Sequence, residues 1–156
     1  IMGIEDHREF RKGMLLDDKK ISVFGENLKE QYDIRCPNVD LTAGSLSGGN
    51  QQKVILAREI SKNPKLMVVS QPTRGLDVGA IEYVHAQLLE QRKRGCAILL
   101  ISYDLDEIMS LSDRILAIYN GEIIEEYTGD NVNSGSIGLA MTGISKKDVA
   151  QSVEVK

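Results

Sequence analysis

Several residue types that mark other protein classes are scarce in this chain of 156 residues. It contains two cysteines, three prolines and no tryptophan, so neither a disulfide framework nor a collagen-like chain is indicated. Cys36 and Cys96 are distant in sequence from both histidines, and we expect reduced thiols rather than metal ligands. With 42% hydrophobic and 27% charged residues, the composition is that of a globular protein, and a chain of this length can bury a core.

Long hydrophobic runs and a strong excess of one charge are also missing. No apolar stretch approaches the roughly 18 residues that a membrane-spanning helix needs, and the N-terminus does not resemble a secretory signal. We therefore expect a chain that neither spans a membrane nor is secreted by itself. The formal net charge of −4 argues against broad electrostatic binding to nucleic acid or anionic lipid. Any anion site must be local.

The hydrophobic period changes along the chain and predicts three regions. Residues 1–63 are helical or irregular, residues 64–128 alternate between strands and helices, and residues 129–156 form a tail with a loop to Gly138 and one short helix. Continuous apolar runs in the second region are typical of parallel strands covered on both faces, and Asn120-Gly121 predicts a hairpin turn. The expected helices lie at 21–32, 48–61, 79–94 and 105–111, and the expected strands at 66–69, 97–101, 114–119 and 122–127.

The most specific segment is Leu46-Ser47-Gly48-Gly49-Asn50-Gln51-Gln52-Lys53, which opens the second expected helix. A serine N-cap followed by two glycines leaves backbone N–H groups uncovered at the positive end of the helix dipole, where a phosphate could bind. An ordinary capped helix with a glycine-rich approach is the alternative.

The chain resembles the nucleotide-binding domain of ABC transporters in the order and spacing of several segments. These are the segment 46–53, the apolar strand after it, Pro72-Thr73, Gly75-Leu76-Asp77 and a second strand. The likeness covers roughly residues 1–128. In its sequence after Thr73 the chain is similar to the second ATP-binding half of subunits that energise the import of simple sugars or ribonucleosides. The resemblance implies part of an α/β fold of the P-loop NTPase (ABC ATPase) type: a helical signature subdomain at 1–63, the second half of the core sheet at 64–128, and the tail.

In that family two nucleotide-binding domains pair head to tail, and each signature segment closes on the ATP held by the other domain. The resemblance implies that the Ser47-Gly48-Gly49 segment donates hydrogen bonds to the γ-phosphate and that Gln51 lies close to the nucleotide. Asp77 would cross the interface in the D-loop, or serve only as a helix N-cap. The residues assigned to nucleotide binding are thus Ser47, Gly48, Gly49, Gln51, Asp77 and, in a segment that resembles the Q-loop, Glu5.

Three chemically important positions depart from the family pattern. The family's magnesium-holding aspartate corresponds to Ser70, its catalytic glutamate to Gln71 and its switch histidine to Tyr103. A hydroxyl is a poor ligand for a hard cation, and glutamine cannot accept a proton from water. We therefore expect a degenerate site with no catalytic residue and no metal ligand of its own, although end-of-strand residues without a function remain the alternative.

The P-loop pattern G-x-x-x-x-G-K-[ST] does not occur among the 156 residues. A chain without this loop cannot hold ATP in the usual way, so we expect a C-terminal fragment of a longer ATPase, inactive alone. The parent subunit is expected to use ATP and Mg²⁺.

The expected partners are the other nucleotide-binding half on the same polypeptide, transmembrane permease subunits and, indirectly, an extracytoplasmic substrate-binding protein, at the cytoplasmic face of the cell membrane. Nucleic acid is not an expected partner. Two other interpretations stay open: a non-transport ABC ATPase acting on nucleic acid or ribosomes, and a non-catalytic dimerisation or regulatory module.

The segment 8–38 is rich in apolar residues that either contact the permease or form core: Met14, Leu15, Leu16, Ile21, Val23, Phe24 and Tyr32.

Overall fold

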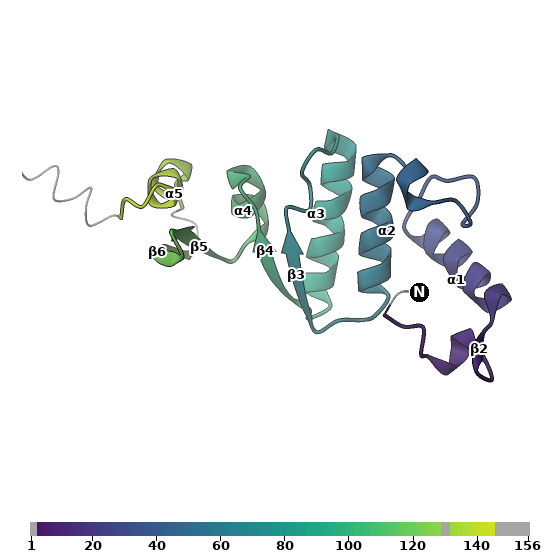
Figure 1. Ribbon diagram of the computed structural model, residues 1–156. Coiled ribbons are helices and arrows are strands. Elements are labelled where there is room, and N and C mark those ends of the chain that lie inside the picture. Colours follow the sequence, from purple (N-terminus) through teal and green to yellow (C-terminus); the bar gives the residue numbers. More distant parts are fainter. Residues whose placement is uncertain (1–2, 129–131, 146–156) are drawn as a thin grey trace, which may run out of the picture. The chain divides into compact units, whose positions relative to one another are not determined.

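The computed structural model describes residues 3–128 and 132–145. The chain divides into two compact units, Ile1–Leu99 and Leu100–Lys156, and each is described by itself. Figure 1 shows the elements of both units. The first unit contains η1 (Arg8–Phe10), β1 (Arg11–Lys12), β2 (Leu15–Leu16), α1 (Asp18–Gln31), η2 (Ala43–Ser45), α2 (Gly48–Ile60), β3 (Leu66–Ser70), α3 (Val78–Lys93) and the start of β4 (Ala97–Ile101).

Helices α2 and α3 pack side by side and form the centre of the first unit (Figure 1). The inward stripe of α2 places Leu56, Ala57 and Ile60 in the core, and α3 contributes Val84 and Leu88. These residues follow the three- and four-residue spacing of one helix face, which the sequence predicts. The predicted helices are therefore confirmed in this part of the chain.

Strands β3 and β4 are hydrogen-bonded neighbours joined by α3, as the β-α-β pattern predicts. The prediction that both faces of these strands are covered is wrong for the described residues. Met67 is buried, but Leu66 and Val68 on either side of it are 60% and 63% exposed, and Leu99 of β4 is 53% exposed. A continuous apolar run needs packing elements on both faces, and the described part of the chain covers only one.

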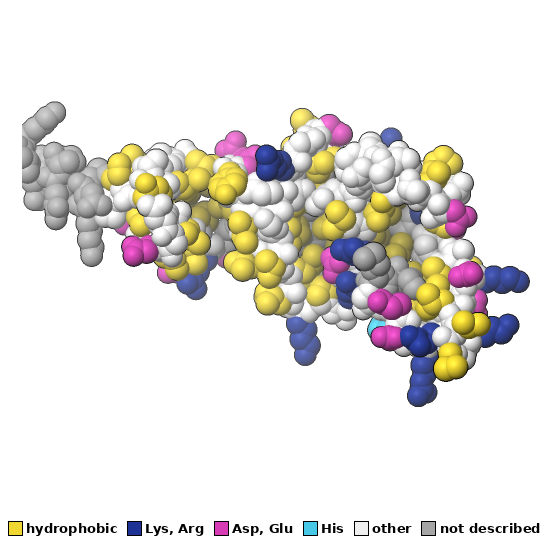
Figure 2. Space-filling view, viewed as in Figure 1, with side chains coloured by type: hydrophobic (Ala, Val, Ile, Leu, Met, Phe, Trp, Pro, Cys, Tyr) yellow, Lys and Arg dark blue, Asp and Glu magenta, His cyan; other side chains and the backbone are white. Residues whose placement is uncertain are grey.

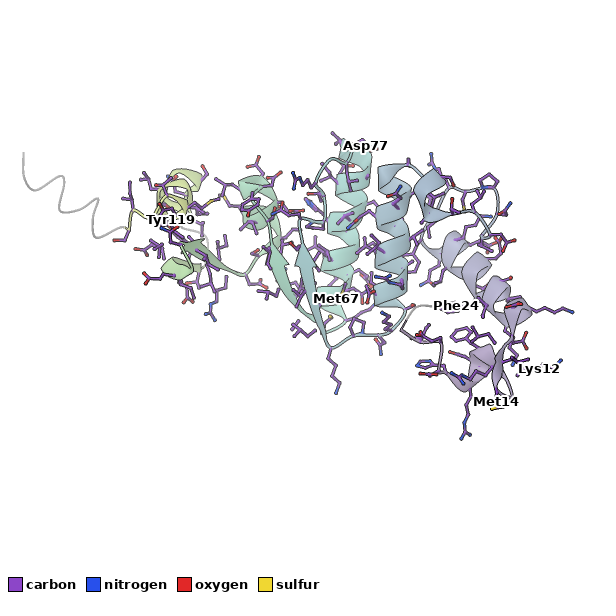
Figure 3. All side chains as sticks on the ribbon, viewed as in Figure 1. Lys12, Met14, Phe24, Met67, Asp77 and Tyr119 are labelled. Carbon is purple, nitrogen blue, oxygen red and sulfur yellow. The ribbon has the colours of Figure 1, made fainter. Side chains whose placement is uncertain are left out.

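A small antiparallel hairpin, β1–β2, precedes α1 and is absent from the sequence prediction. Arg11 pairs with Leu16 and Lys12 with Leu15, while Gly13 turns the chain with a φ of +69°. Two-residue strands are too short to show an alternating pattern, so the sequence gives no period to detect. Figure 3 shows Lys12 and Met14 at this hairpin.

The second unit contains α4 (Leu105–Leu111), β5 (Arg114–Tyr119), β6 (Glu122–Thr128) and α5 (Ser134–Met141). Strands β5 and β6 form the predicted antiparallel hairpin. Asn120 and Gly121 both have positive φ, at 50° and 83°, as a type I′ turn requires. The core of this unit is formed by Ile115, Ala117, Tyr127, Ile137 and Ala140.

The prediction of a loop up to Gly138 is wrong, because helix α5 occupies Ser134–Met141. It begins at Ser134, because the side chain of Asn133 accepts a hydrogen bond of 2.7 Å from the backbone N–H of Gly135 and caps the first turn. Ile137 and Ala140 then hold the helix on the hairpin. The other parts of the predicted tail, 129–131 and 146–156, lie outside the described residues. In the part of the chain that the structure describes, no helix is both long and apolar enough to span a bilayer.

Candidate functional site

The N-termini of α2 and α3 lie together at one end of the first unit. A Cβ added to Gly49 would lie 3.1 Å from the Cβ of Ala80 in the first turn of α3, and one added to Gly48 would lie 3.8 Å from Leu76 just before α3. Figure 3 labels Asp77 at this end of α3. Two helix starts, each with unpaired backbone N–H groups, are thus brought together.

Ser47 caps α2, as the sequence predicts. Its Oγ accepts a hydrogen bond of 3.4 Å from the backbone N–H of Asn50 and one of 2.9 Å from the Asn50 side-chain amide. Ser47 and Gly48 are both exposed, so this helix terminus is accessible to an anion. The amide of Gln51 turns back and donates to the carbonyl oxygen of Leu46 at 2.9 Å, which fixes the glycine-rich approach to the helix.

Asp77 caps α3. Its Oδ1 accepts a hydrogen bond of 2.9 Å from the backbone N–H of Ala80, which confirms the capping interpretation and leaves the predicted D-loop role as a prediction. The side chain is exposed beside the start of α2, where a residue that crosses to a partner would have to be.

Ser70 and Gln71 end strand β3. Ser70 is exposed. Gln71 has a φ of +50°, a backbone conformation that is uncommon for a residue with a side chain, and its Nε2 is buried without a hydrogen-bond partner. Neither side chain offers the negative charge that holds a divalent cation or accepts a proton.

Tyr103 lies in the second unit, in the short segment between β4 and α4. It is 78% exposed. Next to it, Asp104 accepts hydrogen bonds from the backbone N–H groups of Asp106 at 3.0 Å and Glu107 at 3.1 Å and is the N-cap of α4.

Glu5 lies near the start of the described chain and is exposed. Hydrogen bonds from its own backbone N–H and from that of Gly3 lower the pKa of its carboxyl group. The residue is therefore an acceptor that stays ionised at neutral pH, held by its local backbone.

A polar cluster that sequence reasoning missed joins the end of α1 to α2 and α3. The ammonium group of Lys53 donates to the carbonyl oxygen of Asp33 at 2.7 Å and to its carboxylate at 2.8 Å, and it lies 4.5 Å from the ring centre of Tyr83. The Tyr83 hydroxyl donates to the carbonyl oxygen of Tyr32 at 2.9 Å. Lys53 lowers the pKa of Asp33, and burial raises the pKa of Tyr83 to about 12.

The missed cluster has no local signature. Asp33 and Lys53 are 20 residues apart in sequence, so no periodic pattern connects them. The left-handed backbone of Asp33, with a φ of +47°, ends α1 and turns its carbonyl group toward α2.

Solved ATP-binding cassettes share this fold. The structure matches an ATP-binding cassette of an ABC transporter in its ADP conformation with a TM-score of 0.60 and 25% identity, over 89% of this chain and 51% of that one. A nucleotide-free cassette matches with a TM-score of 0.62 and 27% identity, over 81% and 47%. The chain thus has part of the α/β fold of the P-loop NTPase domain of ABC ATPases, as the sequence predicts.

Curated relatives narrow this class further. A comparison with models of protein families found no match. The glucose import ATP-binding protein of Haloferax volcanii is 50% identical over 145 residues, which are 90% of this chain and 26% of that protein. The nucleoside import ATP-binding protein of Lactococcus lactis is 49% identical over 128 residues, which are 82% and 25%.

The chain spans about a quarter of the length of these relatives. It is a homologue of the ATP-binding subunits of ABC importers for sugars and nucleosides, and it corresponds to part of a nucleotide-binding domain.

Proposed function

We propose that this chain is part of the ATP-binding subunit of an ABC importer for sugars or ribonucleosides, and that its signature segment completes the ATP site of a partner nucleotide-binding domain. Ser47, Gly48 and Gly49 donate hydrogen bonds to the γ-phosphate, and Asp77 approaches the same site. Gln51 supports the loop at the nucleotide.

The exposed start of α2 carries this proposal. Ser47 and Gly48 are accessible and stand at the positive end of a 13-residue helix, next to the capped start of α3. Charge-assisted hydrogen bonds to phosphate are roughly twice as strong as neutral ones. Because Ser47 and Gly48 are exposed, a phosphate brought by a partner can reach these donors.

The nucleotide site that the family resemblance assigns to the end of β3 is degenerate in this proposal. Ser70 and Gln71 provide no carboxylate, and among the described residues no group of three histidine, cysteine, aspartate or glutamate side chains is placed to hold a metal ion. Ser70 and Gln71 therefore do not fit Mg²⁺, and we assign this ion, with ATP, to the site held by the partner domain. Tyr103 takes the position of the switch residue without a cationic side chain.

The uncovered face of β3 and β4 supports the view that the chain is part of a longer subunit. Leu66, Val68 and Leu99 are more than half exposed, and full burial of one such side chain contributes about 1.5–3 kcal/mol. We infer that the rest of a cassette, including the phosphate-binding loop, covers this face. Glu5 then lies in the segment that resembles the Q-loop and contributes to nucleotide binding.

The proposed partners follow from this assignment. They are a second nucleotide-binding half on the same polypeptide, permease subunits in the membrane and, through these, a substrate-binding protein. The subunit would lie at the cytoplasmic face of the membrane. The importer names of the relatives support transport over a role in nucleic-acid or ribosome chemistry.

Calorimetric titration of the 156-residue chain with Mg·ATP tests the proposal. Without a phosphate-binding loop the chain should bind ATP with a dissociation constant in the millimolar range or weaker and should not hydrolyse it. Magnesium-dependent binding in the micromolar range would show that the chain holds a functional nucleotide site by itself.

A further inference from the structure

The side chain of Asn50 connects the signature serine to a different part of the chain. Its Oδ1 accepts a hydrogen bond of 2.8 Å from the backbone N–H of Arg35, and its Nδ2 donates to the Oγ of Ser47 at 2.9 Å. The orientation of the amide follows from chemistry, because a backbone N–H can only donate and so must face the amide oxygen. The amide nitrogen is left to face Ser47.

This arrangement determines the direction of the Ser47 hydroxyl group. A serine oxygen has one proton and two acceptor positions. Both acceptor positions are directed toward Asn50, one to its backbone N–H at 3.4 Å and one to its Nδ2. The hydroxyl proton therefore points away from Asn50, and the Ser47 side chain is exposed.

A phosphate oxygen accepts hydrogen bonds and donates none. A serine that donated its hydroxyl proton to a neighbour would present lone pairs to the phosphate and repel it. We propose that Asn50 is a positioning residue that keeps the Ser47 hydroxyl in the donor state for a phosphate group of the nucleotide held by the partner domain. The inference rests on the proposed function and adds a residue to it: Asn50 acts through Ser47 and does not contact the nucleotide.

A double-mutant cycle in the full-length subunit, assembled with its permease, tests this inference. Ser47→Ala should lower kcat/KM for ATP by about 10²-fold, the usual loss for one phosphate-stabilising donor. Asn50→Leu, which has a similar size and no hydrogen bonds, should lower it by about tenfold because the hydroxyl is no longer directed. If Asn50 acts through the serine, the double variant should stay within about twofold of Ser47→Ala.

A second variant separates the direction of the hydroxyl from the stability of the loop. Asn50→Asp retains an oxygen for the Arg35 N–H but presents another oxygen to Ser47, so the hydroxyl should turn inward and donate to it. We expect Asn50→Asp to lose at least as much activity as Asn50→Leu, while its melting temperature stays closer to that of the parent. Gln52→Glu is the matched control, with the same charge change in the same helix turn, and should retain activity within about threefold.

The outcomes separate this inference from the proposed function. Full activity of Ser47→Ala would overturn both. Loss of activity in Ser47→Ala combined with a further tenfold loss in the double variant, or with an active Asn50→Asp, would overturn the role of Asn50 and leave the site in place.

Discussion

Gly48 and Gly49 are adjacent at the start of α2, but packing requires only one of them to be glycine. A Cβ on Gly49 would lie 3.1 Å from the Cβ of Ala80, closer than ordinary van der Waals contact, whereas a Cβ on Gly48 would meet Leu76 at a normal 3.8 Å. Gly49 therefore serves the contact between α2 and α3. Gly48 has space for a side chain, so its glycine has to be explained by what approaches from outside.

We predict opposite effects of alanine at these two positions on the free energy of unfolding. Gly49→Ala should lower it by about 1–3 kcal/mol, because an overpacked contact forces the two helices apart. Gly48→Ala should leave it unchanged or raise it by up to about 1 kcal/mol, because alanine favours the helix. Chemical denaturation of both variants is the measurement, and equal destabilisation would contradict the packing argument.

Tyr83 gives the first unit a pH dependence on the alkaline side. Burial raises its pKa to about 12 from the ordinary 10.0, and its hydroxyl donates to the Tyr32 carbonyl oxygen. Because the folded pKa is the higher one, the stabilising contribution of the protonated hydroxyl is complete below the unfolded pKa and is lost as the pH rises through the folded pKa.

Tyr83→Phe should therefore remove part of the fall in stability between pH 10 and 12. At neutral pH the variant should lose about 1 kcal/mol with the hydrogen bond to Tyr32. Denaturant unfolding of both proteins across this pH range provides the comparison. The same decline in the two proteins would show that the ionisation of Tyr83 is not linked to folding.

At the scale of elements, the first unit has a second exposed apolar surface besides that of β3 and β4, on the hairpin β1–β2 and α1. Met14 is 95%, Leu15 75% and Val23 61% exposed, and Figure 2 shows hydrophobic side chains on this part of the surface. The sequence left open whether these residues form core or contact the permease. Phe10 is buried against Phe24, with ring centres 4.9 Å apart, so some apolar residues of the segment form core and others are exposed. Contact between the exposed residues and the permease stays a prediction.

We predict that Met14→Glu uncouples transport from ATP hydrolysis in the assembled importer. A charge on this exposed tip should weaken a contact with the permease while leaving the ATP site intact, so ATP turnover should persist and uptake should fall by about tenfold or more. Ile123→Glu, at a residue of the second unit that is 60% exposed, is the control and should keep both activities. Normal coupling in Met14→Glu would remove the hairpin from the proposed permease contact.

Local chemistry explains which elements the sequence predicts. Ser47 and Asp77 cap their helices, and Asn120-Gly121 forms its turn, through contacts within a few residues. The sequence alone therefore predicts these features. Helix α5 begins within an expected loop because Asn133 caps it and its burial depends on the hairpin. The hydrogen bond from the Arg35 N–H to Asn50 joins residues that are 15 positions apart, so no local pattern predicts it.

At the scale of the whole molecule, our account explains the exposed sheet and the incomplete nucleotide site in the same way, by protein beyond this chain. In this account, further protein covers the exposed apolar side chains of β3 and β4 and brings a phosphate to the accessible start of α2. The relatives contain such protein in the remaining three quarters of their length. The composition and the periodicity cannot show this, because each is as compatible with a complete domain as with part of one. Our proposal that the chain is part of a domain rests instead on the exposed face of the sheet.

Steady-state ATP turnover of two variants of the full-length subunit tests the central claim most directly. Gly48→Asp places a carboxylate at an open position of the helix start, where it should not disturb folding but should repel the phosphate. We predict a loss of about 10²- to 10³-fold. Gln71→Ala removes a buried amide nitrogen that has no hydrogen-bond partner and should change turnover by less than about threefold. If Gln71→Ala is as damaging as Gly48→Asp, the end of β3 is catalytic and the account of a degenerate site is wrong.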